Sequence, residues 1–240
     1  MSAVKSTQFN NSKPSLRQWV KWIVQLFVLI LVMDGILFLF AGRLDWAGGW
    51  ILTLLYLAFL LVFLIWTMRN APDLLQERGR MATNVKAWDK ILLTLYTIAL
   101  VSLLIVAALD AGRFRWTEMP IVLQALGMLG LIPCGVWLLW VTRTNAYLSR
   151  YARIQDDRGQ QVVTTGPYAY VRHPMYAAVI PFIFCIALVL GSWWALIPGG
   201  VIAALFVIRT ALEDRMLRAE LPGYAEYAAH VRYRLVPGVW

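Results

Sequence analysis

The chain has 240 residues, of which 60% are hydrophobic and 15% are charged, and its formal net charge is +9. This composition lies outside the usual range of soluble domains and excludes an ordinary soluble enzyme. Because the apolar residues come in long blocks rather than in amphipathic stripes, we expect an all-α, polytopic bundle of membrane helices.

Four apolar blocks occupy the first part of the chain, and each is long enough to cross a bilayer, which takes about 20 residues in a helix. They are Trp22–Phe40, Trp50–Met68, Ile91–Leu109 and Ile121–Val141. The first block follows several basic residues, as the core of a signal sequence does. It is longer than such a core, however, and no small-x-small cleavage site closes it, so we expect a retained membrane helix.

A fifth stretch, Pro174–Ile208, contains no charged residue. As a single helix it would be about 52 Å long, which exceeds the hydrocarbon core of about 30 Å. Gly191 and Ser192 lie near its middle, so we predict a helical hairpin with the arms Tyr176–Leu190 and Trp193–Ile208. The bundle then has about six hydrophobic passes.

The basic residues are divided unevenly between the two ends of the predicted bundle. Of the 22 Lys and Arg residues, all but Arg43, Arg113 and Arg115 fall at one end. Because basic residues stay on the cytoplasmic side, we expect both termini to be cytoplasmic. This topology also accounts for the net charge, so binding to membrane lipids is expected and binding to nucleic acid is not.

Three further features are interpreted as structural. The loop Arg69–Lys90 has Pro72 at the start of a short amphipathic helix, which we expect on the membrane surface. Asp34 lies inside the first span, where a carboxylate is costly unless it is paired, and we expect a structural partner for it. Cys134 and Cys185 are expected to be packing residues, and the cysteines and histidines lack the spacing of a metal site.

The polar segment before the hairpin contains most of the candidate functional residues. It ends in Gly166-Pro-Tyr-Ala-Tyr-Val-Arg-His-Pro-Met-Tyr176, where a glycine and two prolines break regular structure. The residues between these breaks include Tyr168, Tyr170, Arg172 and His173. Aromatic and basic residues at this depth often serve as interfacial anchors. An anchor does not need this order of residues, so we expect a functional site.

A pair of acids follows the hairpin. The last arm is expected to continue as a helix beyond the hydrocarbon and to present Glu213 and Asp214, which point in different directions because adjacent helical positions are about 100° apart. Each acid has a basic residue four positions away, Arg209 and Arg218 respectively. Simple surface salt bridges are therefore an alternative to a binding site.

These elements resemble the isoprenylcysteine carboxyl methyltransferase family, within the wider group of small membrane methyltransferases that includes phospholipid N-methyltransferases. The resemblance covers Asn145 to Trp240: the Gly-x-Tyr-x-x-x-Arg-His-Pro-x-Tyr run, the hairpin, the paired acids and a tyrosine-rich tail. Asp214 departs from the glutamate usual in the family, and Ala177 and Ala178 stand where a glycine is often found. The loop before the third span resembles that of bacterial members, which implies a bacterial inner-membrane protein.

The resemblance implies a four-span membrane region, residues 1–144, followed by a methyltransferase-like region, residues 145–240. It implies S-adenosylmethionine in a pocket facing the cytoplasm and a lipophilic acceptor arriving from the bilayer, either a carboxylate such as an isoprenylcysteine or a lipid amine. The implied cofactor-binding residues are Gly166, Pro167, Tyr168, Arg172, His173, Pro174, Tyr176, Glu213 and Asp214. The implied catalytic residues are Arg172, His173 and Glu213.

The residue types suit these roles. Arg172 would form a bidentate pair with a carboxylate of the cofactor or the acceptor. The two acids would accept hydrogen bonds from the ribose or the amino group, and tyrosines would pack against the adenine or the sulfonium. A carboxylate acceptor needs no general base, whereas an amine acceptor would use His173 or Glu213.

Two other classes stay open at this point. One is a membrane reductase of the sterol-reductase type that uses NADPH. The other is a non-enzymatic membrane subunit in which the same segments are structural. No dinucleotide-binding glycine fingerprint is present, although such reductases do not require one.

Overall fold

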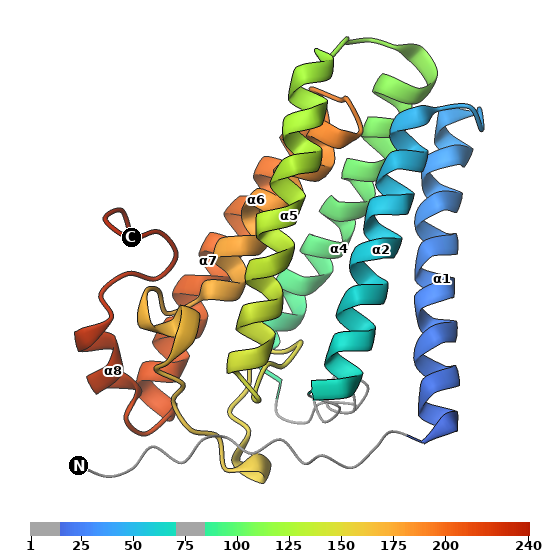
Figure 1. Cartoon of the computed structure of the whole chain (residues 1–240). Helices are drawn as coiled ribbons and strands as arrows, with labels where there is room; N and C mark the ends of the chain where they lie inside the picture. The colour runs from blue at the N-terminus through green and yellow to red at the C-terminus, as the bar shows by residue number, and fades with distance from the viewer. Residues whose placement is uncertain (1–14, 71–84) are drawn as a thin grey trace.

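The computed structural model describes residues 15–70 and 85–240, and within these residues it contains helices and no strands (Figure 1). The helices are α1 (Leu16–Ala41), α2 (Ala47–Asn70), α4 (Ala87–Ala107), α5 (Ile121–Thr144), α6 (Pro174–Val189), α7 (Leu196–Glu220) and α8 (Tyr224–His230). The predicted loop helix after Pro72 lies outside the described residues.

Five helices are long and apolar enough to cross a membrane: α1, α2, α4 with its π-helical extension Ala108–Phe114, α5 and α7. The four predicted apolar blocks lie within the first four of them. The sixth pass, α6, is apolar but has only 16 residues. The structure thus confirms an all-helical, polytopic membrane bundle.

The predicted hairpin is formed by α6 and α7, which are joined by a turn in which Gly191 adopts a left-handed φ of 74°. Buried Asp110 holds this turn by accepting a hydrogen bond of 2.6 Å from the Ser192 hydroxyl. The helix α7 then runs without interruption to Glu220, so it carries the paired acids as its last turns.

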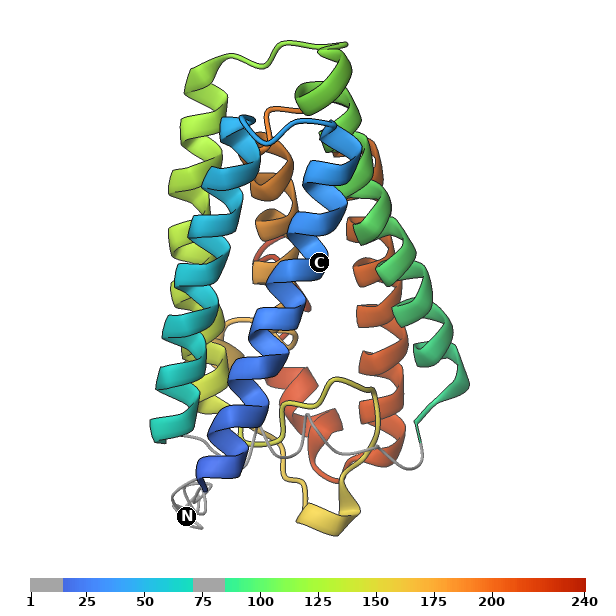
Figure 2. The ribbon, with the colours of Figure 1, turned by 90° about the vertical axis from the view of Figure 1, so that its right-hand side faces the viewer.

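The helices alternate in direction, so the start of α1, the end of α2, the start of α4 and the ends of α5 and α7 meet at one end of the molecule (Figures 1 and 2). We call this the basic end. Among the described residues it holds every Lys and Arg except Arg43, Arg113 and Arg115, as the sequence predicts. The polar segment 145–173, hereafter the connector, folds over the basic end.

Small residues bring α5 and α6 close together. A Cβ atom on Gly127 would lie 2.7 Å from the Cβ atom of Leu188, and one on Gly130 would lie 2.7 Å from the Cys185 sulfur. In lipid, helices associate through such close packing because no hydrophobic force drives them together. These contacts join the start of α5 to the end of α6. Toward the basic end, the Trp137 indole N–H of α5 donates a hydrogen bond of 2.9 Å to the Pro174 carbonyl oxygen, which holds the start of α6.

Asp34 has the structural partner predicted for it. Its carboxylate accepts a hydrogen bond of 2.6 Å from the Thr53 hydroxyl, which joins α1 to α2. The acid therefore lies well apart from the connector and the paired acids.

Candidate active site

The connector reaches the site through a tight turn at Gly166. This residue has a left-handed φ of 59°, and a Cβ atom on it would lie 2.7 Å from the Thr144 hydroxyl oxygen at the end of α5. Both constraints favour glycine. The short 3-10 helix Gly166–Ala169 that begins here turns Tyr168 inward, where its hydroxyl accepts a hydrogen bond of 2.7 Å from the Asn145 amide.

A cavity opens between the connector, the start of α6, the last turns of α7 and α8. It encloses about 770 Å³ of space not filled by atoms, part of it open to solvent. Six of the nine predicted binding residues line it: Tyr168, Arg172, His173, Pro174, Tyr176 and Glu213. Gly166, Pro167 and Asp214 do not line it.

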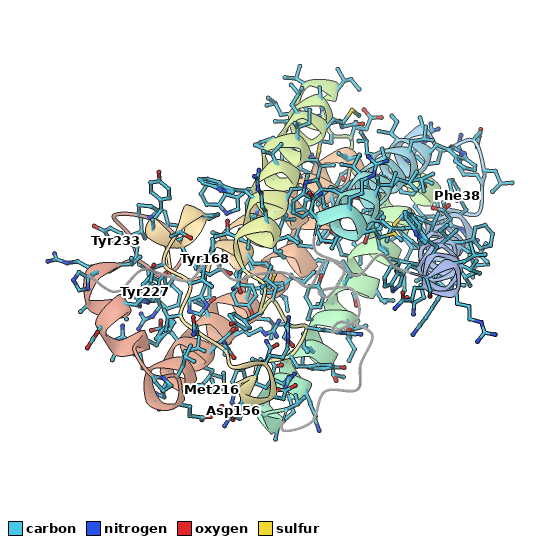
Figure 3. All side chains as sticks on the ribbon, turned by 60° about the horizontal axis from the view of Figure 1, so that its bottom comes forward. Phe38, Asp156, Tyr168, Met216, Tyr227 and Tyr233 are labelled. Atoms are coloured by element: carbon cyan, nitrogen blue, oxygen red, sulfur yellow. The ribbon has the colours of Figure 1, made fainter. Side chains whose placement is uncertain are left out.

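Further residues of the wall were not predicted to belong to a site. They come from the connector and from the helices that close it, and include Tyr147, Leu148, Tyr151, Arg153, Leu217, Leu221, Tyr224 and Tyr227. Viewed from the basic end, Tyr168 and Tyr227 lie close to each other on the side of the molecule away from Phe38 of α1 (Figure 3). The Tyr227 hydroxyl donates a 2.7 Å hydrogen bond to the Tyr168 carbonyl oxygen, which fixes α8 to the connector.

The tyrosines around the cavity stay protonated. Burial raises the pKa of Tyr168, of Tyr224 and of Tyr227 well above the ordinary tyrosine value. Their hydroxyls are therefore donors as well as acceptors at any physiological pH. The wall combines flat aromatic surface with neutral polar groups.

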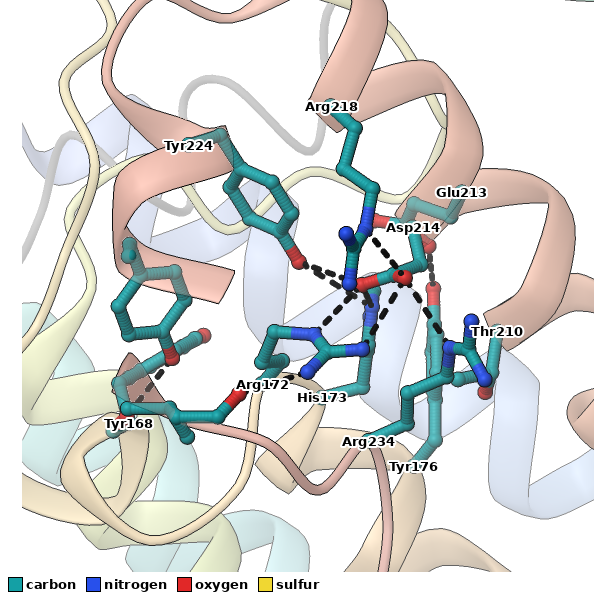
Figure 4. Close-up of polar contacts among 12 residues, drawn as sticks. Tyr168, Arg172, His173, Tyr176, Thr210, Glu213, Asp214, Arg218, Tyr224 and Arg234 are labelled. Atoms are coloured by element: carbon teal, nitrogen blue, oxygen red, sulfur yellow. Dashed lines mark hydrogen bonds and ion pairs between the residues drawn. The ribbon is translucent and has the colours of Figure 1, made fainter. Parts of the chain in front are cut away.

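Arg172 and Asp214 form a buried ion pair (Figure 4). The Arg172 Nε atom lies 2.7 Å from Asp214 Oδ1, and its Nη2 atom lies 3.1 Å from Oδ2, so the contact is bidentate. The side chains are 2% and 1% exposed, respectively. Such a planar pair is among the strongest hydrogen-bonded ion pairs in proteins.

Arg172 also holds the C-terminal segment. Its Nη1 atom donates to the carbonyl oxygens of Val231 and Arg232, at 2.6 and 2.8 Å. The backbone N–H groups of Arg172 and His173 donate to the carbonyl oxygens of Tyr233 and Arg234. The guanidinium is thus engaged by protein groups, and the carboxylate with which it pairs in this structure is that of Asp214.

Asp214 is the centre of a polar cluster. Besides Arg172 it contacts Arg218 at 3.1 Å, Arg234 at 3.0 Å and Tyr224 at 3.1 Å, and the His173 Nε2 atom lies 3.5 Å away. The predicted pair of Asp214 with Arg218 is therefore present. It belongs to a cluster centred on a buried carboxylate and is not a simple surface salt bridge.

Glu213 faces the other way, as the helical geometry predicts. It lines the cavity and accepts a hydrogen bond of 2.6 Å from the Tyr176 hydroxyl. The Tyr176 ring stacks on the His173 ring, with the planes 6° apart and the centroids 5.9 Å apart. The connector and the acidic helix therefore close over the same hollow.

Arg209 does not form the predicted pair with Glu213. It pairs instead with Asp89 on α4, a residue to which the sequence interpretation gave no role. Asp89 lies in the first turn of α4, where charged residues often mark the water boundary. No short sequence pattern indicates this pair, because its members are 120 residues apart.

The chemistry of the wall fits a nucleotide-like ligand with a cationic part. Glu213 offers a carboxylate acceptor, the tyrosines offer π-faces that attract cations, and Leu148, Leu217 and Leu221 offer apolar surface for a flat ring. Among residues 15–70 and 85–240, no three His, Cys, Asp or Glu side chains gather as a metal site would need.

Residues 122–221 match the family model described as phospholipid methyltransferase. The match runs from the start of α5 through the connector and the hairpin to the end of α7, so it contains the predicted site residues. This family is related to the isoprenylcysteine carboxyl methyltransferases, and the match confirms the resemblance found in the sequence.

Two curated bacterial relatives are similar over part of their length. The cobalt-zinc-cadmium resistance protein CzcN of Cupriavidus metallidurans is 34% identical over 132 residues, which cover 52% of this chain and 55% of the relative. The nickel-cobalt-cadmium resistance protein NccN of Alcaligenes xylosoxydans xylosoxydans is 29% identical over 134 residues, with the same shares covered. The chain spans about half the length of these relatives. Together the family match and the helices support a membrane methyltransferase.

Proposed function

We propose that this protein is an integral membrane methyltransferase that transfers a methyl group from S-adenosylmethionine to a lipophilic acceptor. The observation that carries the proposal is the shared cavity: the basic connector and the acidic end of α7 line one hollow, within the region that matches the phospholipid methyltransferase model. We further propose that the basic end faces the cytoplasm of a bacterial cell, with both termini on that side.

Each predicted residue then has a proposed role. Glu213 accepts hydrogen bonds from the ribose or the amino group of the cofactor, and Tyr168 and Tyr176 pack against its flat or cationic parts. Arg172 forms part of the wall and is held by Asp214 behind it, while Gly166 and Pro167 shape the turn that leads to it. His173 and Pro174 form the edge from which α6 enters the bilayer.

When bound, S-adenosylmethionine supplies an electrophilic methyl group. The chain contributes by holding the two reactants in line and by excluding water, since methyl transfer neutralises charge and needs little covalent help. A carboxylate acceptor needs no base. Both Glu213 and His173 line the cavity, but the His173 Nε2 atom lies within 3.5 Å of Asp214 and Tyr224. For an amine acceptor, Glu213 is therefore the better-placed base.

Calorimetric titration of the detergent-purified protein tests this proposal. Binding of S-adenosylhomocysteine that is weakened in Glu213→Gln, but not in the control Glu226→Gln on the exposed face of α8, supports it. Binding of NADPH in place of S-adenosylhomocysteine would indicate the reductase class instead. A folded protein that binds neither compound would indicate the non-enzymatic class.

A further inference from the structure

A second buried ion pair lies outside the residues assigned above. The Arg209 Nε atom on α7 is 2.8 Å from Asp89 Oδ1 on α4, and its Nη2 atom is 3.4 Å from Oδ2. Asp89 is fully buried and Arg209 is 6% exposed. The pair joins two helices at the basic end, at the level where the connector crosses them.

The same two side chains hold the connector. Asp89 Oδ2 accepts a hydrogen bond of 2.7 Å from the backbone N–H of Ala152, and Arg209 Nη2 donates one of 3.0 Å to the carbonyl oxygen of Arg150. Tyr151, which lines the cavity, lies between these two anchored backbone groups. One wall of the cavity is therefore fixed to the pair.

Arg209 also contacts Tyr176. The Arg209 guanidinium carbon lies 5.3 Å from the centroid of the Tyr176 ring, a distance at which a cation is attracted by the ring. Tyr176 in turn donates its hydroxyl hydrogen to Glu213. Arg209 thus supports the residue that orients the acid on the cavity wall.

An ion pair is a poor way to stabilise a buried interface, because desolvation of two charges offsets much of their attraction. Apolar side chains of similar size would pack the interface between α4 and α7 equally well. A directional pair does something that such side chains cannot, since it fixes three elements at defined atoms: the connector, α4 and α7.

We propose that Asp89 and Arg209 are positioning residues that set the connector and the Tyr176–Glu213 pair at the correct separation for a ligand. This inference rests on the proposed function. Neither residue lines the cavity, so both act through Tyr151 and Tyr176 rather than by touching the ligand.

The test compares Asp89→Asn with Asp110→Asn. Both acids are fully buried and both accept several hydrogen bonds, but Asp110 holds the hairpin turn at the opposite end of the bundle. We expect Asp89→Asn to raise the dissociation constant for S-adenosylhomocysteine about tenfold, and Asp110→Asn to change it less than about twofold, because distant sites do not couple. The double variant Asp89→Asn/Arg209→Gln removes both charges and serves if the single variant does not fold.

A double-mutant cycle separates positioning from general destabilisation. If the pair acts through the hydrogen bond from Tyr176 to Glu213, much of the loss caused by Asp89→Asn disappears in a Tyr176→Phe background. An equal loss in both backgrounds, or an equal loss in the Asp110→Asn control, would overturn the inference.

Hydrogen exchange provides a readout that needs no ligand. We expect Asp89→Asn to speed exchange in peptides covering residues 147–163 and Asp110→Asn to speed it around residue 192. If the wild-type protein does not bind S-adenosylhomocysteine, the proposed function fails, and unchanged exchange over 147–163 would separately show that the pair does not hold the connector.

Discussion

Arg172 and Asp214 meet through two parallel hydrogen bonds of 2.7 and 3.1 Å, almost completely shielded from solvent. Arg172 comes from the connector and Asp214 from the last turns of α7, so the pair joins segments separated by the whole hairpin. Because the same guanidinium also binds two carbonyl oxygens near the C-terminus, it ties three segments together.

Arg172→Lys is expected to lower stability. Lysine keeps the charge but cannot make the bidentate contact and the two carbonyl contacts at once. Each buried acceptor left without its donor costs about 1–3 kcal/mol. The thermal unfolding midpoint in detergent measures this. Arg218→Lys is the control, since Arg218 contacts the same carboxylate from a side chain that is 43% exposed. Equal midpoints for the two variants would contradict the central role of Arg172.

The adjacent acids are expected to separate stability from binding. Glu213→Gln removes a charge at the cavity wall and is expected to weaken S-adenosylhomocysteine binding about tenfold or more, with a small change in the unfolding midpoint. Asp214→Asn leaves Arg172 without its charged partner and is expected to lower the midpoint clearly. Calorimetry and thermal unfolding of both variants check this. If both changes affect both quantities equally, the two acids do not have separate roles.

Gly166→Ala is expected to cost more than its matched control. Gly166 and Gly159 have left-handed φ angles of 59° and 57°. Alanine at either position therefore lowers the free energy of unfolding by about 1–2 kcal/mol. At Gly166 the added methyl group also meets Thr144, whereas Gly159 has open space around it. The unfolding midpoint should fall further for Gly166→Ala. A Thr144→Ser change that removes the nearby methyl group should recover only part of the loss, because the hydroxyl oxygen remains the closer atom.

Gly127→Ala is expected to separate α5 from α6. Its added methyl group would lie 2.7 Å from the Leu188 side chain and 3.0 Å from a backbone oxygen of α6, and overpacking of this kind costs about 1–3 kcal/mol. Gly200→Ala on α7 meets no atom within 4 Å and should be neutral or slightly stabilising, since alanine favours a helix. Thermal unfolding of the two variants distinguishes close packing from a general intolerance of alanine.

The sequence predicted the bundle well because each apolar block carries its own signal. The length of each apolar block identifies a span, and the distribution of basic residues gives its direction. Neither depends on which helices contact each other. The opposite directions of Glu213 and Asp214 were predictable for the same reason, since they follow from the geometry of a single helix. The cavity lined by the connector and α7 was expected only from the resemblance to the membrane methyltransferases.

Partners distant in the chain could not be predicted in this way. Nothing local to Asp89 indicates Arg209, which lies 120 residues later, and both have nearer charged residues with which to pair. The interpretation of Arg172 as a ligand for a free carboxylate treated it as unpaired, whereas the fold brings Asp214 and the C-terminal carbonyl groups to it. These contacts depend on how α6 and α7 pack, which a single sequence does not encode in any short pattern.

The hydrogen bonds from Arg172 to the carbonyl oxygens of Val231 and Arg232 can form only after the chain has been synthesised beyond the last apolar helix. A ribosome delivers the six apolar helices to the bilayer before it delivers these residues, so a nascent bundle can be inserted while its cavity still lacks one side. The side of the pocket formed by Tyr224 and Tyr227 is added only when α8 and the segment after it fold back onto the connector. Membrane integration and competence to bind a ligand are therefore separate events in the biogenesis of this protein.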